Sequence, residues 1–365
     1  IANGTGSQII FGVDFGNLVF RNAGAKTLVS PITVHGNLTI ESGSSFDAGA
    51  STLTLGGDWI NDGTFTPSYS TIVCTGTNKV ISGNSTFHRF SVYGSYTIMD
   101  DVTFDSLLVI NTGGSLSGGS TIHTTMNGDL INRGILYTLG TTTFTGDVLQ
   151  TLSLIDAVQT VAVTVNFNGT VSPILNSSTA PQYGYLNINN TGGIYPSVGW
   201  TILYALTVGS GAIFDGGELT HNIMGSMTNN GTIASAGTLN FLPATAKTID
   251  FGSDFSSTGL VVLGGAGAIT LAGTPDTLQD VTISNTNGAG ISPASNWGIA
   301  NNLTVRGGSI LNAGSYNYWI GQNLLNNGTI NSGTSNFVFN GTTHQDIYNA
   351  SPFYDLTMDN SVVHA

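Results

Sequence analysis

One polar phrase recurs four times in this chain of 365 residues, and its spacing limits the folds that the chain can adopt. The phrase contains Asn-x-Gly, and its glycines are Gly63, Gly134, Gly231 and Gly328, with separations of 71, 97 and 97. A second phrase is a short apolar pattern centred on Leu18, Phe90, Leu186, Val281 and Leu356, with separations of 72, 96, 95 and 75. Two repeat lengths therefore recur, and the longer one contains one additional block.

The additional block lies in one half of the repeat. The distance in sequence from each apolar phrase to the next Asn-x-Gly glycine is 45, 44, 45 and 47, whereas the distance from that glycine to the following apolar phrase is 27, 52, 50 and 28. A stack of units that contact only their neighbours can gain a whole unit without disturbing the others. We therefore predict a β-solenoid with about 24 residues per coil, a length typical of solenoid repeats, and super-repeats of three or four coils.

The segments between the glycines have the alternation of strands. "GNLTIESGS" from Gly36, "YALTVGSGA" from Tyr204 and "NNLTVRGGS" from Asn301 alternate apolar residues with Thr, Ser and Asn, which is the period of a strand with one buried face. Glycine and asparagine tolerate the positive φ angles of tight corners. The predicted repeat corners are Asn61, Gly63, Asn132, Gly134, Asn229, Gly231, Asn326 and Gly328.

These patterns predict an all-β chain, a single-stranded right-handed parallel β-helix of about 15 coils. The right hand is expected from the general preference of parallel β crossovers. We expect one continuous solenoid over residues 1–365, with super-repeats at 15–86, 87–182, 183–277 and 278–352, and a further repeat beginning at 353. Neither end has the polar cap that a solenoid needs, so we expect either a longer chain or subunits joined end to end.

Composition narrows the partners and the compartment. The net charge is −13, with only seven Lys and Arg residues. Because nucleic acid binding depends on clustered basic side chains, we expect no nucleic acid partner. No run of about 18 apolar residues is present, so we expect no membrane insertion. Cys74 is the only cysteine and is expected to be a small buried apolar group. A chain with 7% charged residues and many Gly, Thr and Asn is typical of an exported protein.

The repeat resembles a pattern of large secreted cell-surface proteins that are common among Bacteroidota. That pattern is G-x-W-x-N-x-G-T-F, then S-T-V-x-F-x-G, then Q-x-I. It is carried here by "GGDWINDGTF" from Gly56, "STIVCTG" from Ser70, "SNFVFNG" from Ser335, and the glutamines Gln150 and Gln345. Ile135 departs from it, because it replaces the Thr after Gly134. The resemblance implies a stalk or adhesin shaft. The expected stacking of coils is also similar, in its general principle only, to that of filamentous-haemagglutinin-type and autotransporter passenger rods.

The polar residues do not form a recognisable catalytic or metal motif. Four aspartate pairs are spaced by four residues, and a glycosidase needs two carboxylates close together in space, but aspartate is also a favoured turn residue. The pairs are Asp58 and Asp62, Asp101 and Asp105, Asp250 and Asp254, and Asp276 and Asp280. Asp100, Asp101 and Asp105 form an acidic group that we interpret as a corner and not a calcium site. The histidines have no metal-ligand spacing. We therefore predict no catalytic, cofactor or metal residues.

Two residue types suggest surface functions. Aromatic side chains can stack on sugars, and the richest sets are Tyr183, Tyr185, Tyr195, Tyr316, Tyr318 and Trp319, for which packing is the favoured role. Eleven N-x-S/T sequons begin at Asn3, Asn37, Asn84, Asn168, Asn176, Asn189, Asn230, Asn302, Asn327, Asn340 and Asn349. A composition this rich in Asn, Ser and Thr produces such sequons by chance.

The sequence thus predicts a non-enzymatic structural segment, a shaft or adhesin repeat region, of an extracellular or cell-surface protein. Glycans or other cell surfaces are the expected partners, without a cofactor. The first alternative is a subunit of a filament that self-associates end to end. The second is a polysaccharide-binding or polysaccharide-degrading β-helix.

Overall fold

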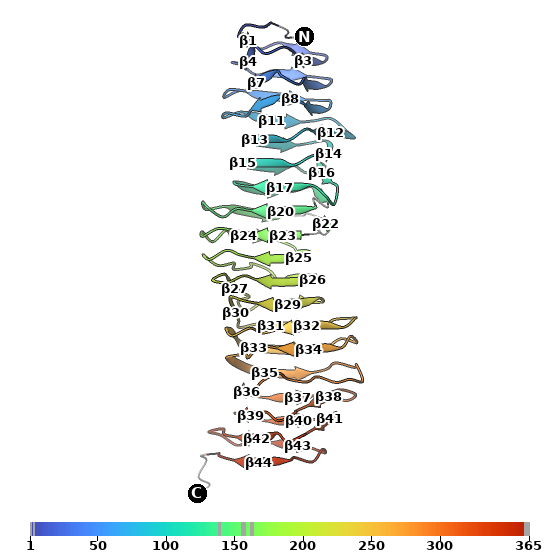
Figure 1. Cartoon of the computed structure of the whole chain (residues 1–365), viewed down its shortest axis with the longest axis vertical. Coiled ribbons are helices and arrows are strands. Elements are labelled where there is room, and N and C mark those ends of the chain that lie inside the picture. The colour runs from blue at the N-terminus through green and yellow to red at the C-terminus, as the bar shows by residue number, and fades with distance from the viewer. Residues whose placement is uncertain (1, 3, 138–139, 155–157, 161–163, 361–365) are drawn as a thin grey trace. The chain divides into compact units, whose positions relative to one another are not determined.

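The computed structural model describes residues 2, 4–137, 140–154, 158–160 and 164–360. These residues are strands, turns and irregular segments without a helix, and so contain no helix able to cross a membrane. They divide into two compact units, Ile1–Thr179 and Ala180–Ala365, here called the first and the second unit. Each unit is a β-solenoid of parallel strands stacked coil upon coil (Figure 1).

Each coil of the first unit visits three stacks of strands in turn. One stack contains β2 (Asp14–Phe15), β5 (Ile32–Val34), β8 (Thr52–Leu55), β11 (Thr71–Cys74), the second halves of β13 (Ser85–Val92) and β15 (Val102–Ile110), β18 (Asp129–Asn132), β21 (Thr151–Leu154) and β24 (Ile174–Ser177). The next contains β3 (Leu18–Phe20), β6 (Leu38–Ile40), β9 (Trp59–Asn61), β12 (Lys79–Ser82), β14 (Ser95–Ile98), β16 (Ser115–Gly118), β19 (Ile135–Tyr137) and β22 (Val158–Thr160). The last begins with β1 (Gln8–Ile10), β4 (Ala25–Leu28), β7 (Ser45–Asp47) and β10 (Thr64–Thr66), and continues with the first halves of β13 and β15, β17 (His123–Met126), β20 (Thr141–Phe144) and β23 (Thr164–Phe167).

The second unit has the same three-stack plan. One stack contains the second halves of β25 (Gln182–Ile188) and β26 (Thr201–Val208), β29 (Ser226–Asn229), β32 (Lys247–Asp250) and β34 (Ile269–Ala272), then Ile291 and Ser292, β38 (Ile310–Asn312) and β41 (Thr329–Asn331). Another contains β27 (Ile213–Asp215), β30 (Thr232–Ser235), the first halves of β33 (Phe255–Leu263) and β35 (Thr277–Ile283), β36 (Trp297–Ile299), β39 (Asn317–Ile320), β42 (Asn336–Phe339) and β44 (Asp355–Met358). The remaining one contains the first halves of β25 and β26, β28 (Thr220–Ile223), β31 (Thr238–Phe241), the second halves of β33 and β35, β37 (Leu303–Val305), β40 (Leu324–Asn326) and β43 (Ile347–Asn349).

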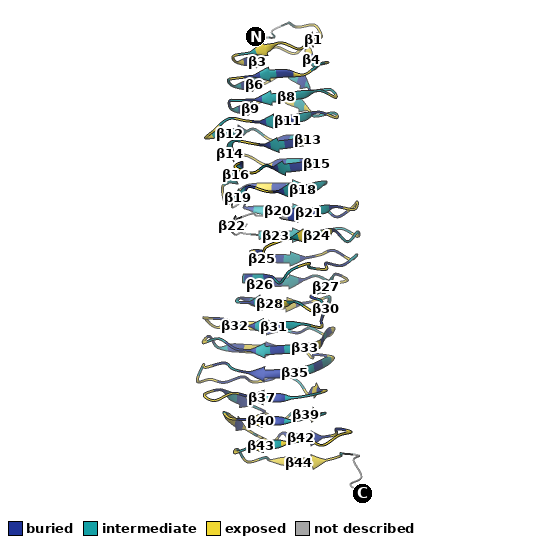
Figure 2. Ribbon diagram, turned by 180° about the vertical axis from the view of Figure 1, so that it is seen from behind, coloured by how far each residue is buried: buried dark blue, intermediate teal, exposed yellow. Residues whose placement is uncertain are grey.

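The core of each unit is built from side chains that repeat in register. In the first unit a row of fully buried side chains runs through Leu53, Ile72, Phe90, Leu108 and Leu130, each paired with the next. Their strand neighbours face outward, as the period of two requires. Buried residues therefore alternate with partly exposed ones along the strands (Figure 2). Cys74 is buried in the same way, which confirms the prediction for that residue.

The coils are shorter than predicted. Residues that pair across one turn give the length of a coil as the difference between their numbers. In the first unit Ile72 pairs with Phe90, and Thr142 pairs with Val165. In the second unit Val281 pairs with Leu303. All three differences are smaller than the predicted coil, so more coils fit into the chain.

The described parts of the two units together make about 17 coils, against the predicted 15. The parallel solenoid is confirmed, whereas its right hand remains a prediction.

The predicted coil was too long because the repeat does not close on a whole number of coils. From Asn61 at the end of β9, the chain makes three coils, through β12 and β14 to β16, and then two further strands to Asn132 at the end of β18. From Asn229 it makes four coils, to β38, and two further strands to Asn326. The two intervals differ by one coil, as predicted, but each repeat also moves the Asn-x-Gly phrase to another face.

Candidate functional site

The Asn-x-Gly phrase forms a corner that packs directly on the coil before it. At Gly231 a Cβ atom would lie 2.3 Å from the carbonyl oxygen of Gly209 and 2.4 Å from that of Ala212. The adjacent Thr232 N–H donates to the Ala212 carbonyl at 2.9 Å. Any side chain larger than hydrogen would therefore push the two coils apart.

The same contact recurs at the other three corners. The nearest backbone oxygens to an added Cβ belong to Glu41 and Ser44 for Gly63, Gly114 and Asn111 for Gly134, and Ser309 and Arg306 for Gly328, at 2.3–2.6 Å. None of the four corner glycines has positive φ. The expectation that they supply left-handed corners is therefore wrong: they are glycine for lack of space. The positive φ belongs to a glycine of the coil below, such as Gly211 at 72°.

The corner asparagines are buried, and Asn229 bonds both within its own corner and to the following coil. Asn229 is 2% exposed, and its Oδ1 accepts the Gly231 N–H at 3.2 Å. Its Nδ2 donates to the carbonyls of Phe251 and Asp254 in the following coil, at 2.8 and 2.9 Å. With the glycine contact below and the amide bonds above, the Asn229 corner joins three coils.

The other three asparagines follow this plan in part, since Asn61 Oδ1 and Asn132 Nδ2 have no partner among the described residues. Asn132 and Asn326 accept the N–H of Gly134 and Gly328, at 3.1 and 3.0 Å. The Nδ2 of Asn326 donates to Asn349 Oδ1 at 2.7 Å, and that of Asn61 donates to the Asn84 carbonyl at 3.0 Å. The sequence located these eight corner residues but did not indicate their bonds to neighbouring coils.

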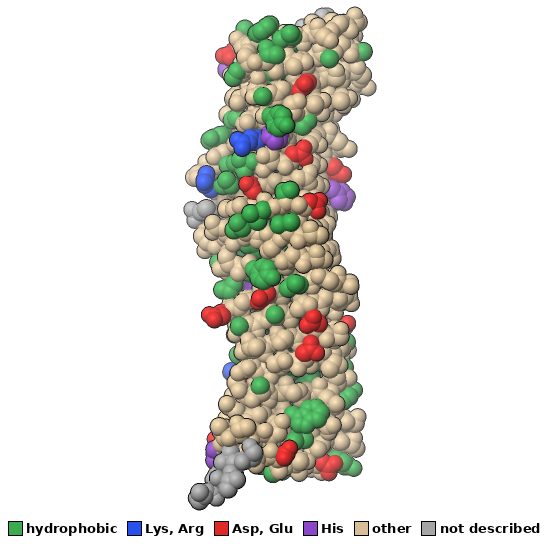
Figure 3. All heavy atoms as spheres, turned by 90° about the vertical axis from the view of Figure 1, so that its left-hand side faces the viewer, with side chains coloured by type: hydrophobic (Ala, Val, Ile, Leu, Met, Phe, Trp, Pro, Cys, Tyr) green, Lys and Arg blue, Asp and Glu red, His purple; other side chains and the backbone are tan. Residues whose placement is uncertain are grey.

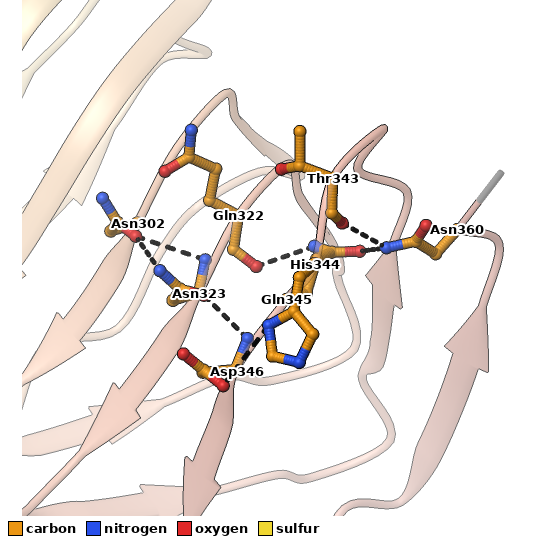
Figure 4. Close-up of polar contacts among 8 residues, drawn as sticks. All are labelled: Asn302, Gln322, Asn323, Thr343, His344, Gln345, Asp346 and Asn360. Carbon is orange, nitrogen blue, oxygen red and sulfur yellow. Dashed lines mark hydrogen bonds and ion pairs between the residues drawn. The ribbon is translucent and has the colours of Figure 1, made fainter. Parts of the chain in front are cut away.

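Two glutamines, Gln150 and Gln345, cap a second type of corner. The sequence analysis identified them as part of the repeat pattern but did not predict a structural role for them. The Gln345 Oε1 accepts the Gly341 N–H at 3.0 Å, and its Nε2 donates to the Ile320 carbonyl at 2.8 Å. The same Nε2 donates to the Gln322 carbonyl at 2.7 Å (Figure 4). Gln150 makes the equivalent bonds to Gly146, Met126 and Gly128. Both side chains thus satisfy backbone groups in the turns between successive strands.

The first repeat has no glutamine at this position and uses a tyrosine. The Tyr96 hydroxyl accepts the Gly76 N–H at 3.1 Å and lies 3.0 and 3.2 Å from the carbonyl oxygens of Leu55 and Gly57. Burial raises the pKa of this hydroxyl above its usual range, so it stays a donor at neutral pH. A different residue from a different strand therefore performs the same task.

Asparagine and aspartate side chains also form ladders along the strand starts. In the second unit Asp280 accepts the Asn302 N–H and Nδ2, at 3.2 and 2.8 Å. Asn302 in turn accepts the N–H and Nδ2 of Asn323 at 3.2 and 3.0 Å, and Asn323 accepts the Asp346 N–H at 2.7 Å (Figure 4). The first unit has a corresponding series at Asn17, Asn37 and Asp58. Each rung fixes the height of one coil on the next.

The suspected carboxylate pairs are mostly engaged in such bonds. Four of these carboxylates accept hydrogen bonds from the following coil: Asp58, Asp101, Asp105 and Asp280. Asp250 accepts the N–H of Gly252 in its own turn, and Asp254 accepts the hydroxyl of Thr232 in the preceding coil. Asp100 accepts the Gly83 N–H at 2.7 Å. The acidic group at residues 100–105 therefore contributes three separate structural bonds, consistent with its interpretation as a corner.

The histidines are dispersed, and one is buried. Among the described residues no group of three or more His, Cys, Asp or Glu side chains could hold a metal ion. His221 is fully buried, with Nδ1 accepting the Trp200 N–H at 3.1 Å and Nε2 lying 3.0 Å from the Gly216 carbonyl oxygen. Burial lowers its pKa below the usual value, although the Gly216 carbonyl acts in the opposite direction. These bonds suit the neutral ring with its proton on Nε2.

The surface residues separate into packed and exposed groups. Tyr183 and Tyr318 are buried, as the packing interpretation requires, whereas Tyr185, Tyr195 and Trp319 are exposed. Among the sequons, exposed asparagines are Asn84, Asn176, Asn189, Asn230, Asn327 and Asn340; Asn37, Asn168, Asn302 and Asn349 are partly exposed, and Asn3 lies outside the described residues. Hydrophobic side chains form separate patches in a polar surface (Figure 3).

Comparison with known proteins adds no relative. No protein-family model, curated protein or solved structure matches this chain.

Proposed function

We propose that this chain is a non-enzymatic structural segment, a shaft or adhesin repeat region, of an extracellular or cell-surface protein. The observation that carries the proposal is the corner motif, repeated four times with the same close contact between coils. Its polar residues serve stacking, because corner asparagines, glutamine caps and ladders direct their donors and acceptors at adjacent coils. Side chains used in this way are those of a scaffold. We also propose that the solenoid is right-handed.

The mechanical basis is the number of backbone bonds between coils. Each coil pairs with both neighbours through parallel strands, and a buried core lies inside. A protease must open several coils before it can bind an extended segment, because no single strand can leave the ladder alone. Such a segment resists the proteases that an extracellular protein encounters.

The proposal is tested on intact cells that express the protein naturally. Antibodies raised against the folded chain should label unbroken cells in immunogold electron microscopy, and mild surface proteolysis should release fragments that contain it. Labelling that appears only after the cells are lysed would contradict the surface location.

End-to-end self-association is the second candidate. It is favoured by β44, which is paired with β42 and exposes all four of its residues (Figure 2). Within the described residues no strand pairs with the other edge of β44, where Leu356 and Met358 are exposed; a strand of a second copy could add backbone bonds and apolar contacts there. Sedimentation of the purified natural protein distinguishes the two roles, since filaments grow with concentration and isolated shafts do not.

A further inference from the structure

Trp319 differs from the other tryptophans of the chain. Trp59, Trp200 and Trp297 are at most 2% exposed, whereas Trp319 is 37% exposed on the outer face of β39. Exposing an indole sacrifices the gain from burying a large apolar side chain. Coil stacking does not require an exposed ring of this kind.

The ring borders a hollow that the neighbouring small residues leave open. Gly298, in the preceding coil, pairs with Trp319, and an added Cβ at Gly298 would meet no atom within 4 Å. Ala300, Gly321 and Gly341 complete the small-residue lining. The hollow spans four successive coils of the second unit, those of β35, β36, β39 and β42. Its volume of about 390 Å³ is within the usual range for small-ligand sites.

Polar groups at the rim are available to a ligand. Asp276, Asn340 and Thr342 line the hollow together with Trp319. Within the described residues, the side chains of Asp276 and Asn340 and the indole N–H of Trp319 make no hydrogen bond or ion pair. This sets them apart from the many Asp and Asn side chains that bond to adjacent coils.

We propose that this hollow binds a neutral β-linked glycan, with one pyranose ring stacked on Trp319. A pyranose whose hydroxyls are all equatorial presents C–H groups on its faces, which suit an aromatic plane, and hydroxyls at its edge. Asp276 and Asn340 lie three coil steps apart, roughly 14 Å at the usual spacing of paired strands, so they would bind different sugar residues of the same glycan. Hydroxyls of these residues would donate to the Asp276 carboxylate and exchange bonds with the Asn340 amide. No Lys or Arg lines the hollow and the chain has a net charge of −13, so an acidic glycan is disfavoured.

The proposal deepens the adhesin role and rests on it, but the two can fail separately. Surface labelling of intact cells tests the location, and glycan binding by the purified chain tests the hollow. A chain that labels the surface but does not bind the sugar would remain a shaft without this site.

The test uses cellohexaose as the neutral probe and hexagalacturonate as the acidic control. Trp319 is the exposed tryptophan, so acrylamide should quench part of the intrinsic fluorescence, and cellohexaose should protect that part. Gly298→Val should fill the hollow and abolish protection while the unfolding temperature is maintained. In calorimetric titrations, Trp319→Ala should weaken cellohexaose binding by about 10- to 30-fold, and Asp276→Asn by a smaller factor.

Tyr204→Ala is the matched control, because Tyr204 is 50% exposed and contacts another exposed tyrosine, Tyr185, with ring centres 5.2 Å apart. It should leave binding unchanged. The proposal is overturned if cellohexaose neither protects Trp319 nor binds in the calorimeter, or if binding survives both Trp319→Ala and Gly298→Val. Preference for hexagalacturonate would overturn it as well.

Discussion

At the scale of single residues, side-chain amides hold the coils together where the strand ladders are interrupted. A corner leaves backbone N–H and C=O groups without strand partners, and buried groups of this kind are costly unless they are bonded. Asn229 and Gln345 each contact three backbone groups. An amide suits this task because it both donates and accepts without carrying a charge.

The first prediction concerns Gln345. Gln345→Ala should leave the Gly341 N–H without its acceptor and the carbonyls of Ile320 and Gln322 without this donor, so the local structure opens more often. We expect hydrogen exchange at Gly341 to accelerate about tenfold or more. Gln322→Ala is the control, since the Gln322 backbone carbonyl, and not its side chain, receives the bond. Equal exchange in both variants would contradict the capping role.

The second prediction concerns His221 and pH. Burial lowers the pKa of His221 in the folded state, whereas the unfolded chain takes up a proton near pH 6.5. Below that pH the unfolded state binds more protons, so the stability that is present above pH 6.5 should fall as the pH falls. Denaturant unfolding between pH 7.5 and about pH 5 should show this slope, and His221→Gln should flatten it. Substitution of the exposed His344 by Gln should leave the slope of stability against pH as it is in the natural protein. If His221→Gln also left this slope unchanged, His221 would not be its source.

At the scale of the element, the repeated unit is a pair of stacked corners in consecutive coils. The lower corner turns through a glycine with positive φ, and the upper Asn-x-Gly corner lies against its carbonyls. This explains why the half of each repeat that leads to the Asn-x-Gly glycine keeps a nearly constant length: the segment contains both corners. The coils outside the pair lack this constraint, so one of them can be present or absent.

The third prediction tests the close contact at the upper corner. Gly231→Ala should destabilise the protein by roughly 2 kcal/mol or more, because the added Cβ meets backbone atoms that cannot move independently. Gly298→Ala is the matched control, as its Cβ enters open space and its φ is not positive. Urea unfolding of both variants measures the difference. A similar loss in both would mean that backbone flexibility, and not space, selects glycine.

The fourth prediction tests the polar ladder. Asn302→Asp replaces the Nδ2 that donates to Asp280 with a second carboxylate oxygen, so two like charges face each other. The variant should be less stable than the natural protein at pH 7, and the deficit should shrink as the pH falls through the carboxylate range. Asn327→Asp, at an exposed corner position, should have little effect. Thermal unfolding at pH 7 and pH 4 provides the comparison, and a deficit that is independent of pH would exclude charge repulsion.

The sequence predicted the architecture because alternation and spacing are direct consequences of stacked strands. The number of residues per coil was overestimated because each repeat was assumed to contain a whole number of coils. In the structure each repeat contains two further strands and therefore ends on a different face of the solenoid. The positions of the corner glycines were predicted correctly, but the reason given for glycine, a positive φ angle, was wrong. The real reason is the close approach of the preceding coil, which cannot be recognised from the residues of one coil alone. The ladder had a visible signal, the Asn or Asp before the first buried residue, as in Asn37-Leu38 and Asp280-Val281. Trp319 was among the aromatic residues that the sequence offered for sugar stacking, but packing was the favoured role, and the small residues of neighbouring coils that form the hollow could not be brought together from the sequence.

At the scale of the whole molecule, the coil is the unit by which the protein changes length. The strands pair with their counterparts one turn away, so the proposed scaffold function would depend on preserving register and not on any single side chain. Register also fixes which residues are buried, because a shift of one residue exchanges the two faces of a strand. Length can therefore change only in whole coils.

The most direct test of this account is a pair of deletions in the second unit. Removing residues 282–303 takes out one coil, since Val281 pairs with Leu303, and brings Thr304 into the place of Thr282. We predict that this variant keeps the circular dichroism of the natural protein and its cooperative unfolding. Removing residues 282–304, one residue more, should expose the core side of β40 and the coils after it and cost most of the cooperative transition. Equal behaviour of the two deletions, whether both fold or both fail, would contradict the account.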